Sequence, residues 1–243
     1  MATKTTVKNR VSPTLHPGTI TSIPGYEQAK GYVHHATTAL DAAYQAVEHV
    51  MEARQKLQLD ESRTQKARVL MAAQMGNKYL DKLQKSFEAS WNNLSAGIEH
   101  TDKALSQPIE EYAGIGNVAT EIRAHLKTMK PGERTQFLSE ALDRGDERTM
   151  KSVLGAPAYL SGMTDLDQVR VTRDYHAKNN PEMAQRVEVM KQVREKLEKA
   201  KPIIFTEMDK AIGATRFEIQ KLQATSNEAE AALVLKEFAP SEN

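Results

Sequence analysis

The sequence predicts an all-α protein: an elongated helical bundle built on an antiparallel coiled-coil hairpin, with a small helical middle region. Apolar residues recur at intervals of three and four over three long stretches, which is the spacing of an amphipathic helix. No stretch alternates apolar and polar residues over the length of a convincing β-strand. Aromatic residues make up only 5% of the chain and charged residues 27%, which favours thin helical packing over one large core.

Residues 1–25 are expected to form a disordered or extended arm. They contain three prolines, show no apolar period and include no acidic residue. Proline fixes φ and removes a hydrogen-bond donor, so it disfavours a regular helix here. The arm also lacks the apolar stretch of a signal peptide. The longest apolar runs in the chain are about five residues, against the roughly 20 needed to cross a bilayer, so no transmembrane segment is expected.

Residues 26–107 are predicted to form a long helical hairpin. Its first helix, 26–57, carries a seam of apolar positions in alternating steps of three and four. The second helix, roughly 62–107, has its own apolar stripe, and the short polar break between the two favours an antiparallel arrangement. The first seam is expected to pack against the second helix, against a C-terminal helix, or against another copy of the chain. Six members of this packing seam are Ala29, Val33, Ala36, Leu40, Ala43 and Val47.

Residues 108–180 are predicted to form a small region of short helices. Gly145 is expected to end one helix in a left-handed conformation, and Asp146 to cap the next. The adhesion tripeptide Arg-Gly-Asp ends at Asp146, but helix punctuation explains this match better. Tyr159 and Leu160 follow a turn rich in glycine and proline, and they are either side chains of the core or a patch that faces a partner.

The last long helix is predicted to cover residues 181–224, with Pro202 bending or breaking it. Residues 225–243 are predicted to form a short amphipathic end and a polar tail. This end is expected to become ordered on binding a partner. Its predicted contact residues are Leu233, Leu235 and Phe238.

The sequence predicts no catalytic, cofactor-binding or metal site, and so no enzyme. Gly114, Gly116 and Ala119 have the spacing of a dinucleotide-binding loop, but no strand precedes them to aim the loop at a pyrophosphate. The chain has no cysteine, and no histidine has a carboxylate three residues before it, as a di-iron helix bundle requires. The net charge is +1, and basic and acidic residues alternate along the last helix, which argues against nucleic-acid binding.

One segment resembles known proteins. Residues 137–146 and 153–162, which read Phe-Leu-Ser-Glu-Ala-Leu-Asp-Arg-Gly-Asp and Val-Leu-Gly-Ala-Pro-Ala-Tyr-Leu-Ser-Gly, look like a segment of small helical proteins of unassigned function encoded by tailed phages and prophages. The likeness covers about 26 of the 243 residues. It implies a phage product that works in the host cytoplasm or in the virion, and it implies no mechanism and no functional residue.

The predicted function is that of a non-enzymatic helical structural or assembly protein. It would act through coiled-coil self-association as a homo-oligomer, or by docking on a protein partner. The alternative is a cytoplasmic regulatory or host-interaction module that binds one protein partner.

Overall fold

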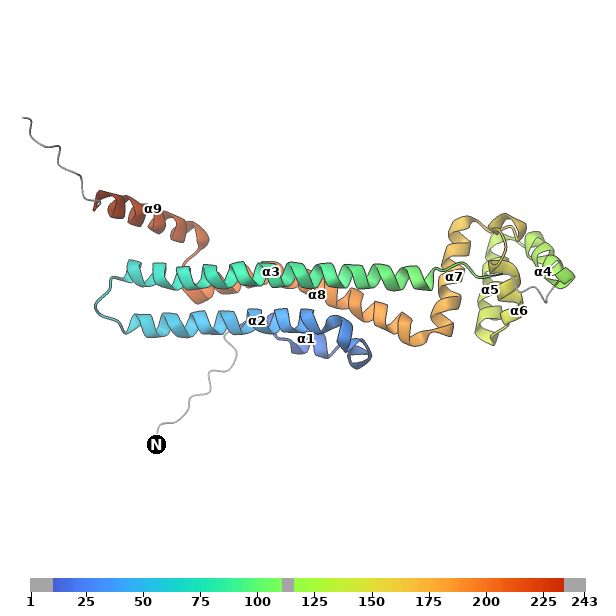
Figure 1. Cartoon of the computed structure of the whole chain (residues 1–243), viewed down its shortest axis with the longest axis horizontal. Coiled ribbons are helices and arrows are strands. Elements are labelled where there is room, and N and C mark those ends of the chain that lie inside the picture. Colours follow the sequence, from blue (N-terminus) through green and yellow to red (C-terminus); the bar gives the residue numbers. More distant parts are fainter. Residues whose placement is uncertain (1–10, 111–115, 234–243) are drawn as a thin grey trace, which may run out of the picture. The chain divides into compact units, whose positions relative to one another are not determined.

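The chain folds entirely into helices in the part that the structure describes. The computed structural model describes residues 11–110 and 116–233, and within them it contains nine α-helices, two 3-10 turns and no strand (Figure 1). The predicted all-α class is therefore confirmed. The elements are η1 (Pro13–Leu15), α1 (Gly18–Thr21), α2 (Tyr26–Gln58), α3 (Gln65–Leu105), α4 (Gly116–Thr128), α5 (Pro131–Arg144), α6 (Glu147–Leu154), η2 (Ala158–Leu160), α7 (Asp165–Asn179), α8 (Pro181–Ile212) and α9 (Arg216–Ala232).

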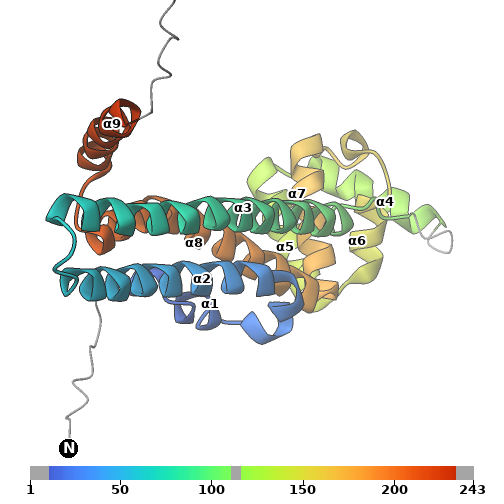
Figure 2. The same cartoon turned by 60° about the vertical axis from the view of Figure 1, so that its left-hand side comes forward.

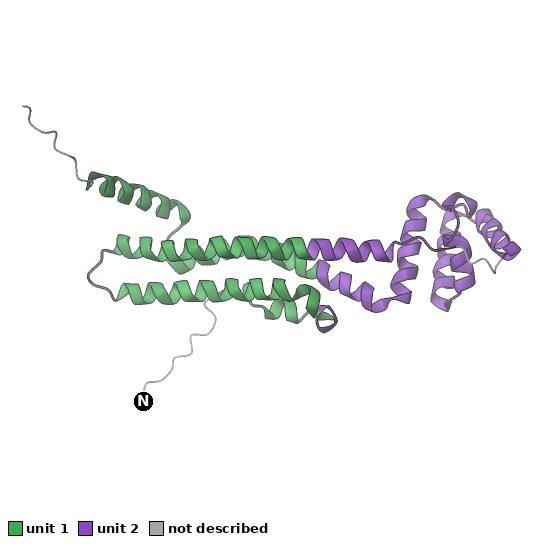
Figure 3. Ribbon diagram, in the orientation of Figure 1, with its two compact units in different colours: residues 1–26, 30–93, 192–243 green, residues 27–29, 94–191 purple. Residues whose placement is uncertain are grey.

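Two compact units share these helices (Figure 3). Unit 1 consists of residues 1–26, 30–93 and 192–243, and unit 2 of residues 27–29 and 94–191. The long helices α3 and α8 each contribute residues to both units.

Unit 1 is a helical bundle built on the α2/α3 hairpin. The two helices lie side by side and run in opposite directions, as Figures 1 and 2 both show. At the hairpin, a ring nitrogen of His49 lies 3.3 Å from the hydroxyl of Tyr79. The end of α8 packs against α3, because a Cβ atom at Gly76 would lie 2.8 Å from the side chain of Ile212. A glycine at this crossing lets the two helices approach closely.

The predicted seam of α2 lies in the interior of the folded chain. The side chains of all six predicted seam residues, at positions 29, 33, 36, 40, 43 and 47, are at most 1% exposed. Ala39 and Ala46, next to the seam, are also buried, so α2 meets its neighbours over a face wider than a single stripe. The seam is thus covered within the same chain, which is one of the expected arrangements.

The expected arm is wrong for residues 11–25, which are folded. This segment forms η1 and α1, and Leu15 and Ile20 are fully buried in unit 1. The rings of His16 and Tyr44 of α2 meet edge to face, with their centroids 5.3 Å apart. The backbone N–H of Ser12 donates to a carboxylate oxygen of Glu207 on α8, at 3.2 Å. The prolines keep the helical elements of this segment short, but its apolar side chains are still buried. Residues 1–10 lie outside the described part of the chain.

The predicted single C-terminal helix over 181–224 is also wrong. Helix α8 continues through Pro202 to Ile212, and the chain breaks at Gly213, whose φ of +82° is left-handed. Thr215 then caps α9: its hydroxyl accepts from the N–H of Glu218, whose carboxylate receives the N–H of Thr215. Such a reciprocal capping box starts a new helix.

Unit 2 contains the predicted small helical region, with a core of its own. Arg134 joins its parts: the guanidinium donates to the carbonyls of Leu126 at 3.0 Å and Met129 at 2.9 Å, and also to the carbonyl of Gly162. Asp102 on α3 pairs with Arg173 on α7 at 2.5 Å. The buried core consists of Leu126, Leu138, Ala141, Met150, Val153, Leu154, Ala158, Met163, Val171 and Tyr175.

The predicted caps at the α5/α6 junction are confirmed. Gly145 ends α5 with a φ of +70°, and the carboxylate of Asp146 accepts the N–H of Thr149 at 3.0 Å. The acid of the Arg-Gly-Asp tripeptide is therefore engaged in starting α6. Its arginine, Arg144, lies 3.8 Å from the carboxylate of Glu140 on its own helix.

Candidate protein-interaction groove

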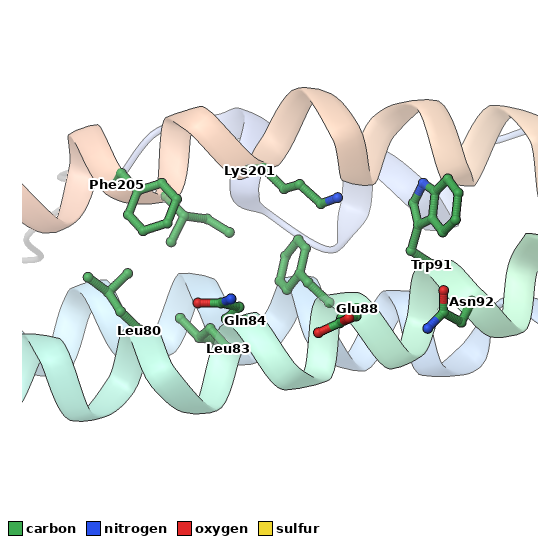
Figure 4. Close-up of a pocket in the computed structure, with 10 residues that line it drawn as sticks. Leu80, Leu83, Gln84, Glu88, Trp91, Asn92, Lys201 and Phe205 are labelled. Atoms are coloured by element: carbon green, nitrogen blue, oxygen red, sulfur yellow. The ribbon is translucent and has the colours of Figure 1, made fainter.

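An open groove of about 550 Å³ runs between α3 and α8 within unit 1 (Figure 4). Its floor is apolar, and polar and charged side chains stand along its edges. The floor residues are Leu80, Leu83, Phe87 and Ile204, and the other lining residues are Gln84, Glu88, Trp91, Asn92, Lys201 and Phe205.

The periodicity of α3 explains why the groove exists. Leu80, Leu83, Phe87 and Trp91 recur at steps of three and four, so they share one face of the helix. Leu83 and Phe87 lie in the middle of this face and are buried, whereas Leu80 and Trp91 lie nearer its edge and are only half-buried. The edge of the α3 stripe is thus covered on one side by α8 and open on the other.

Trp91 is held rigidly at one end of the groove. Its indole N–H donates to a carboxylate oxygen of Glu198 on α8, at 2.9 Å. Two cations flank the ring: the guanidinium carbon of Arg194 lies 5.8 Å from the ring centroid, and the ammonium nitrogen of Lys201 lies 5.9 Å from it. Cations at this range are attracted to an indole face. A fixed aromatic ring with an apolar body and a satisfied polar tip is a typical anchor of protein interfaces.

Phe205 marks the other end of the groove. Its ring is 38% exposed, and the guanidinium carbon of Arg216, on the first turn of α9, lies 4.1 Å from the ring centroid. A second hollow adjoins the groove here and shares Leu80 and Gln84 with it. Ile219 of α9 lines this hollow, so the groove extends to the start of α9.

The groove offers apolar contact rather than reactive groups. Among the described residues, no group of three histidine, aspartate or glutamate side chains could hold a metal ion. The described carboxyls with a lowered pKa are those of Asp60, Asp146, Asp167, Glu195 and Glu218. Glu218 is typical of the shifted groups: the backbone N–H and hydroxyl of Thr215 lower its pKa, because both donate to the carboxylate at the start of α9.

The residues predicted to bind a partner lie elsewhere. Tyr159 and Leu160 are exposed on η2 of unit 2, with 68% and 38% of their surface accessible, so they are not side chains of the core. Leu233 is 81% exposed at the end of α9 in unit 1. Leu235 and Phe238 fall outside the described residues.

Sequence reasoning missed the groove because it treated the stripe of α3 as wholly internal. One signal was present: Phe205 stands next to Ile204 but one position off the apolar stripe of α8. A large aromatic side chain beside a helix's buried face lies at the margin of the core and is half-exposed there.

No helix in the described ranges combines the length and the apolar character that crossing a membrane requires. No protein-family model matches the chain, and searches of curated proteins and of solved structures give no similar protein.

Proposed function

We propose that this chain is a non-enzymatic helical protein of an assembly, and that it binds a protein partner through the α3/α8 groove. The observation that carries the proposal is an open apolar floor that ends in Trp91 and Phe205, while the α2 seam is already covered within the chain. The occupant best suited to an elongated groove between two helices is an amphipathic helix, which would insert side chains spaced at three and four residues.

Peptide selection tests the proposal. A displayed library of amphipathic helical peptides, each about 18 residues long, is selected against the full chain. Trp91 is the single tryptophan, so its fluorescence reports occupancy of the groove directly. We expect selected peptides to shift Trp91 emission, and Phe205→Glu to weaken their binding at least about tenfold, because it places a charge in an apolar contact.

Ala42→Glu is the matched control. Ala42 is exposed on α2, which does not line the groove, so this change adds the same charge without altering the floor. The proposal fails if no peptide shifts Trp91 emission, or if Phe205→Glu binds the selected peptides as well as Ala42→Glu does.

The kind of assembly remains a prediction. The resemblance of residues 137–162 to phage-encoded proteins predicts a role in a virion or in the host cytoplasm. A regulatory or host-interaction module is the second candidate, and the covered α2 seam favours it because self-association through that seam would require the bundle to open. Light scattering separates the two: a mass that rises with concentration supports assembly, and a constant monomer mass supports the regulator.

A further inference from the structure

We propose that α9 folds back at Gly213 and occupies the α3/α8 groove of its own chain, as a helical strap over the surface where a partner would bind. The role of α9 as a strap rests on the proposed function, whereas its docking in the groove is independent of that function. Of the residues of α9, all of which the structure describes, Ile219 alone is buried. Most of the stability of a helix in a protein comes from packing its apolar face against another element.

Helix α9 carries an apolar seam that is only partly used. Its positions alternate in steps of three and four, as in α2: Ile219, Leu222, Ser226, Ala229 and Leu233. The first position is buried, Leu222 and Ser226 are half-buried, and Leu233 is 81% exposed. The small residues at 226 and 229 would let α9 approach another helix closely. The second half of this seam has no cover in the described part of the chain.

The connection between α8 and α9 permits the return. It consists of Gly213, Ala214 and Thr215, and antiparallel helices are ordinarily joined by two to five residues. Gly213 already adopts a left-handed conformation that other residues resist. The first turn of α9 also lies at the groove already, since Arg216 stacks on Phe205 and Ile219 lines the adjoining hollow.

The length of α9 matches that of the groove. From position 80 to position 92 of α3, which bound the lining, the groove is about 18 Å long at 1.5 Å per residue. The α9 seam from Ile219 to Leu233 is about 21 Å long by the same measure. A helix that started at the Phe205 end would therefore reach just past Trp91.

The charges along the two surfaces match in this direction. On α9, Lys221 comes first and the acids Glu228 and Glu230 follow. Asp81 lines the adjoining hollow at the Phe205 end, and Glu88 lines the groove near its middle. At the other end two cations, Lys201 and Arg194, flank Trp91, and one acid, Glu198, accepts its indole N–H. A returning α9 would thus bring its base to the acidic end and its acids to the basic end.

The α9 that occupies the groove is expected to come from the same chain rather than from a second copy, because only three residues join α8 to α9. A short tether gives an effective concentration on the order of millimolar, well above that of a second copy at ordinary protein concentrations.

Disulfide trapping tests the inference, because the chain contains no cysteine and introduced pairs stand alone. Ile219 and Leu80 line the same hollow. Ala229, on the α9 seam, lies ten residues beyond Ile219, and Asn92 lies twelve residues beyond Leu80, so the two differ by only about 3 Å along the helix axis. In a returned α9 these two residues are therefore adjacent. The full chain with Asn92→Cys and Ala229→Cys is oxidised mildly, and the rate of disulfide formation within one chain is measured by mass and gel mobility. The control pairs Ala229→Cys with Ala42→Cys, on the exposed face of α2.

We expect the groove pair to close at least about tenfold faster than the control pair. Adding Leu222→Asp and Leu233→Asp should remove the difference, because both residues lie on the seam. Phe217→Asp, at an exposed position off the seam, should leave it intact. Equal rates for the two pairs overturn the inference. So does a disulfide that joins two chains when the single variants Asn92→Cys and Ala229→Cys are mixed, since this outcome would assign the groove to a second copy.

The trapping experiment uses no partner, so its result is separate from that of the peptide selection. If the groove disulfide forms rapidly but no peptide is selected, α9 is a fourth helix of the bundle and the proposed function is wrong. If peptides bind but the groove disulfide does not form rapidly, the groove stays open and α9 is not a strap.

Discussion

At the residue scale, single polar groups decide where helices start and stop. Asp146 begins α6 by accepting the N–H of Thr149 at 3.0 Å and its hydroxyl at 2.7 Å. These bonds, the backbone one first, lower the pKa of the Asp146 carboxyl below its ordinary value of 3.8. Because the charged form is the better acceptor, the cap is strongest when Asp146 is ionised.

Replacing this cap should cost stability in a pH-dependent way. We expect Asp146→Ala to lower the free energy of unfolding by about 1 kcal/mol at pH 7. A carboxyl whose folded pKa is lowered stabilises the fold above its unfolded pKa and loses that contribution as the pH falls through the folded value. The difference between variant and parent should therefore shrink below about pH 4. Urea unfolding at pH 7 and pH 3 measures it.

Asp143→Ala is the control, since Asp143 is exposed and lies before the junction. It should change the free energy of unfolding by less than about 0.5 kcal/mol at either pH. A loss for Asp146→Ala that is equally large at pH 3 would show that the cap does not depend on ionisation.

At the scale of elements, residues 11–25 belong to the bundle although they have no helical period. Their apolar side chains are few and irregularly spaced, but Leu15 is fully buried and Ser12 is bonded to the buried Glu207. Burial of an apolar side chain depends on area removed from water and not on the secondary structure that carries it.

We therefore expect Leu15→Ala to destabilise the fold by about 2–5 kcal/mol, the range for removing most of a buried leucine. Thr14→Ala, at the exposed neighbouring position, should change stability by less than about 0.5 kcal/mol. Both values come from urea unfolding followed by circular dichroism. Two equally small effects would mean that this segment is not docked on the bundle in solution.

At the scale of the whole molecule, the fold has two cores. The core of unit 2 includes ten buried residues between 126 and 175, and that of unit 1 contains the α2 seam from Val33 to Val47. Regions with separate cores can open separately, with different free energies.

Hydrogen exchange should reveal this separation. In Leu138→Ala, which removes a side chain from the unit 2 core, we expect the amides of α4, α5 and α6 to exchange faster while those of α2 keep their parent rates. Leu40→Ala in unit 1 should give the reverse pattern. A uniform loss of protection in either variant would show that the chain unfolds as one cooperative unit.

The groove illustrates why a site was harder to predict than the helices. The stripe of α3 was evident from its spacing, and the caps at Gly145 and Asp146 from residue type, because both depend on neighbours within one turn. That Trp91 and Phe205 stay half-exposed depends on which helices lie beside them. Spacing identifies the face of a helix that is covered, but not how completely it is covered.

The sequence by itself determined that this protein is all-α, that its longest helices each carry one apolar face, and where Gly145 and Asp146 divide α5 from α6. These properties follow from periodicity and local hydrogen bonding, which act within a few residues. Only the tertiary structure decided that residues 11–25 are buried, that α8 passes through Pro202 and ends at Gly213, and that α3 and α8 leave an open groove. Each of these depends on side chains that are far apart in the sequence and adjacent in the fold.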